Sequence, residues 1–127
     1  FRSLDYTIYC DFIEDTAYEK TKELLNRYPQ ITALFCASDM MAIGAIRAAE
    51  DMGMQVPEDL SVLGFDDIPI AQYVYKGVST VRQCPSMMGR EGGRVVWRMI
   101  QGERVEEEVV LPHELLIRST TGKAPVK

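Results

Sequence analysis

Along this sequence, continuous runs of apolar residues alternate with segments whose apolar residues have the spacing of a helix. Apolar residues dominate 31–37 and 60–65, and between them 39–52 carries alanine and methionine at intervals of three and four residues. A continuous apolar run is typical of a strand buried on both faces of a parallel sheet, and the three-and-four interval is typical of an amphipathic helix. We therefore expect a strand, a helix capped by Ser38 or Asp39, and a second strand.

The segments on either side predict further elements of the same two kinds. Aromatic and β-branched residues at 6–12 indicate a strand, and 16–28 has the spacing of a helix with Asp15 as its N-cap and Pro29 as its stop. The later expectations are a turn at 66–69, a short helix at 70–75, an extended segment at 78–82, a helix from Pro85 to about residue 101, short strands at 106–111 and 114–117, and a polar tail at 123–127. The alternation before residue 83 favours an α/β fold with a doubly wound parallel sheet.

The helix that begins at Pro85 differs from the earlier units, because no strand–helix alternation continues after it. Its apolar stripe, which we expect to be buried, contains Met88, Gly92, Val95, Val96 and Met99. A glycine inside a helix costs about 1 kcal/mol relative to alanine. The presence of Gly89, Gly92 and Gly93 therefore predicts close packing of this helix against another element.

The composition limits the classes of function open to the chain. At 127 residues one domain is expected, and the net charge of −5 argues against nucleic acid as a direct partner of this stretch, because phosphate contacts need a basic face. Three separated cysteines without a C-x-x-C pair indicate free thiols in a reducing, cytoplasmic setting. No apolar stretch is long enough to span a membrane, and the common enzyme motifs are missing. We expect no enzymatic activity, no metal and no cofactor.

Carboxylates follow both strands of the central unit. Ligands of open α/β sheets bind beyond the carboxyl ends of the strands, which makes Asp39 and Asp66 the first site candidates. An ionised carboxylate only accepts hydrogen bonds, so Asp66 suits a ligand rich in hydroxyl or amine donors; helix capping and turn formation are the alternative roles. Phe12 at a strand end suits stacking on a ligand ring, and Gln83 lies where an amide can reach a ligand, although core rings and solvent-facing amides are more common.

The helix at 39–52 carries two large apolar residues on its polar side. Met40 and Ile43 project into the sector that also holds Arg47. Large apolar side chains among surface charges mark a partner surface in some proteins and are scattered surface residues in others. A subunit interface on this helix is one of these two readings.

Four motifs lie in order along the chain. They read A-L-F-C-A-S-D-M-M-A-I-G-A-I-R-A-A-E-D-M-G, V-P-E-D-L-S-V-L-G-F-D-D-I-P, V-S-T-V-R-Q and L-P-H-E-L-L-I-R-S-T-T. Together they resemble the lactose/galactose repressor (LacI/GalR) family of bacterial transcriptional regulators. Their order and spacing follow that family over nearly the whole chain, which makes the resemblance specific.

The resemblance implies that the chain is a fragment of a larger regulator. Such regulators have a helix-turn-helix headpiece, a hinge helix and a two-lobed effector-binding core with a type I periplasmic-binding-protein-like fold. Residues 1–84 would form the C-terminal effector-binding lobe, 85–105 a helix of the other lobe after a crossing segment, and 106–127 the return strands and polar tail. The helix at 85–105 would then lack its neighbours, so we expect the isolated chain to associate or swap between copies.

The resemblance also assigns roles to individual residues. Phe12 matches the aromatic residue that stacks on the effector, and Asp66 matches the aspartate that binds its hydroxyl or amine groups. Ser38 falls where many members carry asparagine, and Gln83 lies on a segment that lines the cleft. The implied dimer interface contains Asp39, Met40, Ile43, Arg47 and Tyr73.

The partners implied by the resemblance are a small effector such as a sugar or nucleobase, a second copy of the chain, and operator DNA through a headpiece absent from this chain. The effector would change the geometry of the lobes and so the affinity for DNA. It can do so only through its different affinity for the two states.

Two other protein classes share part of the pattern. A periplasmic sugar-binding protein of a transport system has the same fold and a similar S-D-M-M-A-I-G stretch, but V-P-E-D-L-S-V-L-G-F-D-D and S-T-V-R-Q favour the regulator. A phosphoacceptor receiver domain has a similar length, acidity and D-D pair. Its acidic pair follows the first strand, however, whereas Asp66 and Asp67 follow the third predicted strand.

Overall fold

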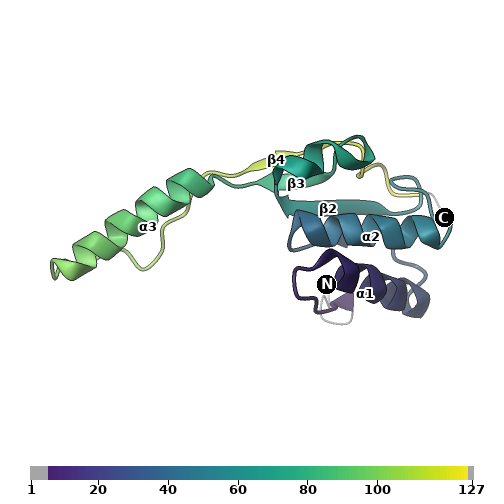
Figure 1. The fold of residues 1–127 in the computed structure, drawn as a ribbon, viewed down its shortest axis with the longest axis horizontal. Coiled ribbons are helices and arrows are strands. Elements are labelled where there is room, and N and C mark those ends of the chain that lie inside the picture. Colours follow the sequence, from purple (N-terminus) through teal and green to yellow (C-terminus); the bar gives the residue numbers. More distant parts are fainter. Residues whose placement is uncertain (1–5, 126–127) are drawn as a thin grey trace.

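The strands of the chain form one sheet in which three neighbours are parallel. The computed structural model describes residues 6–125, and its strands β1 (Ala33–Phe35), β2 (Ser61–Asp66), β3 (Ser79–Arg82) and β4 (Glu114–Leu116) lie in that order across the sheet. The first three are parallel and β4 is antiparallel to β3 (Figure 1). This arrangement confirms the predicted α/β fold with a parallel sheet.

Two helices build the core together with this sheet. α2 (Asp39–Asp51) packs against β2, and α1 (Glu14–Arg27) lies beside α2 (Figure 1). The main cluster of buried residues contains Leu25, Cys36, Ala42, Ala45, Ile46, Ala49, Leu60, Val62, Ala71 and Val78. The apolar face predicted for α2 is therefore the face that the core covers.

A glycine in the middle of α2 sets how closely the two helices approach. A Cβ atom on Gly44 would lie 2.2 Å from the main-chain oxygen of Glu14. Arg47 reinforces the contact, because its guanidinium lies 2.8 Å from the Glu14 carboxylate and 4.3 Å from the ring centroid of Tyr18. These charges are partly exposed and contribute little, so close packing is the main source of stability between α1 and α2.

The segment between β2 and β3 contains two short 3₁₀ helices, η2 (Pro69–Gln72) and η3 (Val74–Lys76). They replace the single short helix predicted at 70–75. Gly77 follows with a φ of +100°, and a Cβ atom there would lie 2.8 Å from the Arg118 side chain. The glycine therefore lets the chain turn into β3 beneath Arg118.

The residues after β4 fasten the end of the chain to the sheet. Thr120 Oγ1 accepts a hydrogen bond from Ser79 N at 2.9 Å and donates one to Val62 O at 2.8 Å. Arg118 Nη1 donates to Val78 O at 2.9 Å. The R-S-T-T end of the fourth motif thus binds both β2 and β3.

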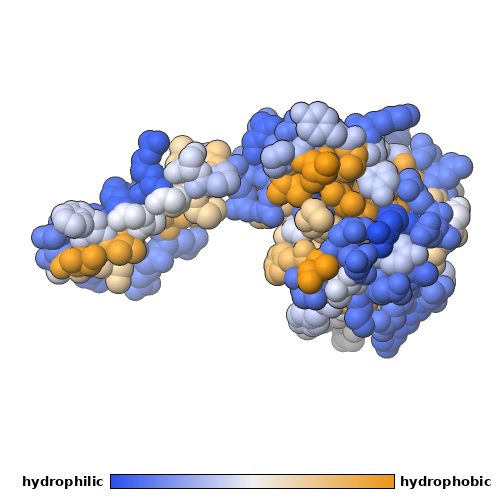
Figure 2. Space-filling model, in the orientation of Figure 1, coloured by the Kyte–Doolittle hydropathy of each residue, from blue (hydrophilic) through white to orange (hydrophobic). Residues whose placement is uncertain are grey.

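The last helix, α3 (Pro85–Ile100), projects away from the sheet (Figure 1). None of its residues is buried, and apolar residues are visible along it (Figure 2). Most of the stripe predicted to be buried is therefore exposed and Val95 is only partly buried, because no helix or strand within residues 6–125 packs over it. Cβ atoms placed on Gly89, Gly92 and Gly93 would meet nothing within 4 Å, so the predicted close packing of these glycines is not made within the described chain.

The strand predicted at 6–12 is wrong. This segment forms no strand, and a cavity of about 920 Å³ lies between it and β1, lined by Tyr6, Ile8 and Cys10 on one side and by β1 residues on the other. A strand needs a partner edge within hydrogen-bonding distance. The composition of the segment favours a strand, but β1 lies across the cavity from it.

The predicted start of the first helix is also wrong. Asp15 is not the N-cap, because α1 begins at Glu14 with Ile13 in the cap position. The Asp11 carboxylate accepts a hydrogen bond from Thr16 Oγ1 at 3.2 Å. Asp11, which precedes the helix, therefore stabilises the first turn of α1 in place of Asp15.

Two predicted strands differ from the structure in their extent. β1 is shorter than 31–37 and is not buried on both faces, because it is an edge strand and Phe35 is 65% exposed. Residues 106–111 form no strand, since Arg98 binds the side chains of Glu103 and Glu106 and so holds this part of the chain along α3. Residues 1–5 and the tail end 126–127 lie outside the described residues.

Candidate ligand-binding site

Two of the predicted ligand residues meet at the carboxyl ends of neighbouring strands. Asp66 ends β2, Gln83 directly follows β3, and Gln83 Nε2 donates a hydrogen bond to Asp66 Oδ1 at 2.6 Å. Since β2 and β3 are parallel, both residues lie at the edge where open α/β sheets bind ligands. Both are half-buried, so their polar groups are held in place and still reach solvent.

The backbone at this edge has an unusual conformation. The φ angle is +107° at Asp66 and +55° at Asp67. Phe12, which lies outside this edge and precedes α1, also has a positive φ, at +64°. Few non-glycine residues adopt this region. Such conformations cost of order 1–3 kcal/mol each, persist only where surrounding contacts hold them, and cluster at binding sites.

Two arginines hold the carboxylate of Asp67. Arg82 Nε donates to Asp67 Oδ2 at 2.7 Å, and Arg118 Nη2 donates to Asp67 Oδ1 at 2.6 Å. Burial by itself would raise the pKa of Asp67, but the hydrogen bonds and charges of the two arginines outweigh it and lower that pKa. With both oxygens in use, Asp67 stabilises the edge and Asp66 is the carboxylate left for a ligand.

Asp39 is fully buried, with a hydrogen bond to each carboxylate oxygen. Oδ1 accepts from Thr80 Oγ1 at 2.6 Å, and Oδ2 accepts from Ile68 N at 2.8 Å. Burial raises the pKa of Asp39 against the effect of these hydrogen bonds, and the nearby charges of Asp66 and Asp67 raise it further. Its side chain has no surface to offer a partner subunit, which removes the direct interface contact predicted for it.

Ser38 and Phe12 stand apart from the Asp66–Gln83 pair in their contacts. Ser38 is buried, and its Oγ accepts a hydrogen bond from Met41 N at 3.2 Å, which is the predicted N-cap of α2. Phe12 precedes α1, and its side chain is 62% exposed, so it is not a core residue. An exposed ring on a positive-φ residue is available for stacking.

The residues predicted for a dimer interface differ in their exposure. Met40 is 39% exposed and Tyr73 is 80% exposed. Ile43 is partly buried against the core, and Arg47 is bound to α1 through Glu14. Met40 and Tyr73 therefore offer the most apolar surface of the set.

Three residues of this edge were not among the predicted site residues: Thr80, Arg82 and Arg118. They lie in the S-T-V-R-Q and I-R-S-T-T motifs. The motifs single out these residues, but they do not show which side chains the residues contact. Arg118 is 51 residues from Asp67 along the chain. Only the register of the sheet brings them together.

A second cavity adjoins Gln83. It measures about 390 Å³ and lies where the sheet joins α3, with Phe65, Met88 and His113 in its lining. His113 is an exposed loop residue. Among residues 6–125 no cluster of side chains fits a metal ion, and no helix there has the length and apolar character to cross a membrane.

Comparison with known proteins identifies a matching domain family and relatives among transcriptional regulators. The sequence matches the periplasmic binding protein-like domain family over residues 5–121. It is 37% identical over 113 residues to the HTH-type transcriptional regulator CelR of Thermobifida fusca, covering 88% of this chain and 33% of that protein. It is 33% identical over 107 residues to the HTH-type transcriptional repressor PurR of Klebsiella pneumoniae, covering 84% and 31%.

Solved structures agree with these relatives. The CelR–cellobiose complex superposes with a TM-score of 0.79 at 37% identity over 88% of this chain and 35% of that chain. The lac repressor dimer bound to operator and the anti-inducer ONPF gives 0.79 at 31% identity over 87% and 39%. The chain thus spans about a third of the length of the curated relatives it matches. It belongs to the periplasmic binding protein-like domain family, and its resemblance to the LacI/GalR regulators is confirmed.

Proposed function

We propose that this chain is the effector-sensing and dimerisation region of a LacI/GalR-type transcriptional repressor whose DNA affinity is switched by a small molecule. The observation that carries the proposal is the Asp66–Gln83 pair at the carboxyl ends of β2 and β3. The regulators among the relatives favour this function over a periplasmic transport protein. DNA contact would come from the helix-turn-helix part that the relatives' names indicate, in the cytoplasm.

The chemistry of the pair suits a neutral ligand with several hydroxyl or amine groups. Asp66 accepts hydrogen bonds, while the Gln83 amide can both donate and accept. Phe12 would stack on the ring of a sugar or nucleobase, and Ser38 would contact the ligand from the start of α2. The relative CelR was solved with cellobiose, which supports a sugar as the first class to test.

The dimer surface would be formed by the exposed part of α2 and by η2 and η3. Met40 and Tyr73 supply exposed apolar area there, and Ile70 is 47% exposed beside Tyr73. Ile43 and Arg47 would lie at the edge of this surface. The lac repressor, a relative of similar fold, was solved as a dimer on its operator, which supports two copies in the working protein.

The α3 helix would belong to a second lobe. The proposed division is 1–84 for the effector-binding lobe, 85–105 for the helix of the other lobe, and 106–127 for the return. The exposed apolar stripe of α3 supports this division. An effector held between the lobes would then change their relative position and so the spacing of the DNA-binding parts.

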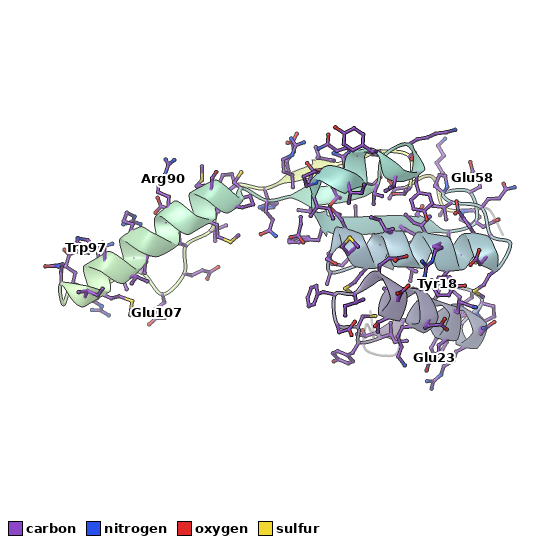
Figure 3. The ribbon with its side chains drawn as sticks, viewed as in Figure 1. Tyr18, Glu23, Glu58, Arg90, Trp97 and Glu107 are labelled. Atoms are coloured by element: carbon purple, nitrogen blue, oxygen red, sulfur yellow. The ribbon has the colours of Figure 1, made fainter. Side chains whose placement is uncertain are left out.

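The test is effector binding by the full-length protein. Isothermal titration would screen cellobiose, maltose, galactose, adenine and hypoxanthine, and each binder would be added to an operator-binding assay. Asp66→Asn should weaken binding about 10- to 100-fold, because a hydrogen bond to a charged group is worth about 1.5–3 kcal/mol. Glu58→Gln, an exposed change on the loop before β2 (Figure 3), should have no effect.

A second pair of variants tests the stacking role. Phe12→Ala should weaken binding by about tenfold, whereas Tyr9→Ala, at an aromatic residue that is 84% exposed nearby, should not. Binding of a sugar or base without any change in operator affinity would contradict the regulator function. Equal binding by wild type and Asp66→Asn would contradict the proposed site.

A further inference from the structure

The Asp39 carboxylate occupies a space that two strands provide. Gly64 of β2 and Thr80 of β3 are direct partners in the parallel register. A Cβ atom on Gly64 would lie 2.3 Å from Asp39 Oδ1, and Thr80 Oγ1 donates to that same oxygen at 2.6 Å. Gly64, which has no side chain, therefore leaves room for the Asp39 carboxylate, and the Thr80 hydroxyl donates a hydrogen bond to it. A buried carboxylate needs hydrogen bonds of this kind to offset the loss of its contact with water.

The same groups fix the main chain that follows Asp66. Ile68 N donates to Asp39 Oδ2 at 2.8 Å, and Asp67 N donates to Thr80 Oγ1 at 3.3 Å. Thr80 thus accepts from the turn and donates to Asp39. Both main-chain N–H groups after the residue with φ of +107° are held by the Asp39–Thr80 pair.

Capping of α2 does not account for Asp39. Ser38 makes the side-chain cap, through the hydrogen bond from Met41 N. Both oxygens of Asp39 point instead to β3 and to the turn after β2. This carboxylate therefore serves the turn rather than the helix that it begins.

We propose that Asp39 is a positioning residue of the ligand site: with Thr80 it holds the Asp66–Asp67 turn in the conformation that presents the Asp66 carboxylate to a ligand. The proposal rests on the proposed function, which gives Asp66 its ligand contact. Asp39 also begins α2, so its carboxylate joins this turn to the first turn of the helix that carries Met40.

Variants of the full-length protein distinguish a role in positioning the Asp66–Asp67 turn from a general contribution to stability. Thr80→Val removes the hydroxyl at nearly constant volume, Thr80→Ser keeps it, and Ile46→Val weakens the buried face of α2 away from the turn. The titration uses whichever of cellobiose, maltose, galactose, adenine and hypoxanthine binds wild type most tightly. Thr80→Val should weaken binding about tenfold or more, Thr80→Ser by about twofold or less, and Ile46→Val should lower Tm with unchanged affinity.

Amide hydrogen exchange tests the turn without any ligand. Asp39→Asn and Thr80→Val should speed exchange at the Asp67 and Ile68 amides about tenfold, while the Val62 amide, bound to Thr120 O, keeps its protection. Unchanged affinity in Thr80→Val, or unchanged exchange at these two amides, overturns the positioning role. If wild type binds none of the probes, the proposed function fails, and the exchange rates still decide whether Asp39 holds the turn.

Discussion

Helices α2 and α3 have similar sequence patterns and opposite surroundings. Each has apolar residues at helical spacing and at least one internal glycine. Seven residues of α2 are buried, whereas none of α3 is. Hydrophobic periodicity shows which face of a helix is apolar, but the covering element decides how much stability that face contributes.

The largest effect on stability is expected when one isoleucine is replaced in each helix in turn. Ile46 is fully buried in α2 and Ile100 is 70% exposed in α3. Ile46→Ala should lower the free energy of unfolding of the 127-residue chain by about 2–5 kcal/mol, through lost burial and a cavity. Ile100→Ala should change it by less than about 0.5 kcal/mol. Urea unfolding measures both, and equal losses would mean that α3 is packed in solution.

A pair of glycines gives a test of intermediate size. Gly44→Ala places a Cβ atom 2.2 Å from the Glu14 main-chain oxygen, so α1 must move, at a cost of about 1–3 kcal/mol. Gly92→Ala places a Cβ atom in open space and should stabilise α3 by about 1 kcal/mol, through helix propensity alone. Circular dichroism with thermal unfolding should show a lower Tm for the first variant and slightly more helix for the second. A loss of stability in Gly92→Ala would contradict an uncovered α3.

The sequence predicts α2 to within one residue at its end, because the signals that define this helix act locally. The cap residue Ser38 and its Met41 partner are three residues apart, and the apolar spacing repeats within the helix. The segment 6–12 has equally clear strand composition but forms no strand. Strand formation depends on a partner edge, so β composition alone is a weaker signal.

The candidate site divides in the same way. Asp66 and Gln83 could be predicted because each lies at the carboxyl end of a strand, and the structure brings them into contact. The bond between Asp39 and Thr80 joins residues 41 positions apart. It depends on the register of β2 and β3, which no local pattern specifies.

A smaller effect is expected from the ion pairs, and it depends on pH. Arg82 and Arg118 lower the pKa of Asp67 even though burial opposes them. The resulting stabilisation is complete above the usual pKa of 3.8 and is lost as pH falls through the lowered value. Asp67→Asn should therefore lower the free energy of unfolding by roughly 1–2 kcal/mol at pH 7. The difference in this free energy between the variant and wild type should become smaller as the pH falls.

The matched control for this pH dependence lies near α3. The pKa of Glu106 is also lowered, by its own backbone hydrogen bond and by Arg98. Glu106→Gln should nevertheless leave unfolding of the sheet with α1 and α2 unchanged from pH 7 to strong acid, because the segment that contains Glu106 runs along α3. Urea midpoints across that range compare the two variants. A constant gap between Asp67→Asn and wild type would show that the arginine pairing is not formed in solution.

The smallest effect on stability is expected from substitutions on the exposed apolar stripe of α3. Their effect on self-association shows whether copies of the chain cover this stripe. Val96 is 55% exposed and Met99 is 58% exposed, and both belong to the apolar stripe of α3, so replacing both by glutamate should change the free energy of unfolding by less than about 0.5 kcal/mol. It should, however, reduce self-association of the 127-residue chain in sedimentation, because the exposed stripe is the surface that copies would cover. Met40→Glu, on the surface of α2, provides the control for the separate surface proposed for the dimer. If wild type sediments as a single monomer at every concentration, copies of the chain do not cover α3, and a second lobe becomes the stronger explanation for its apolar face.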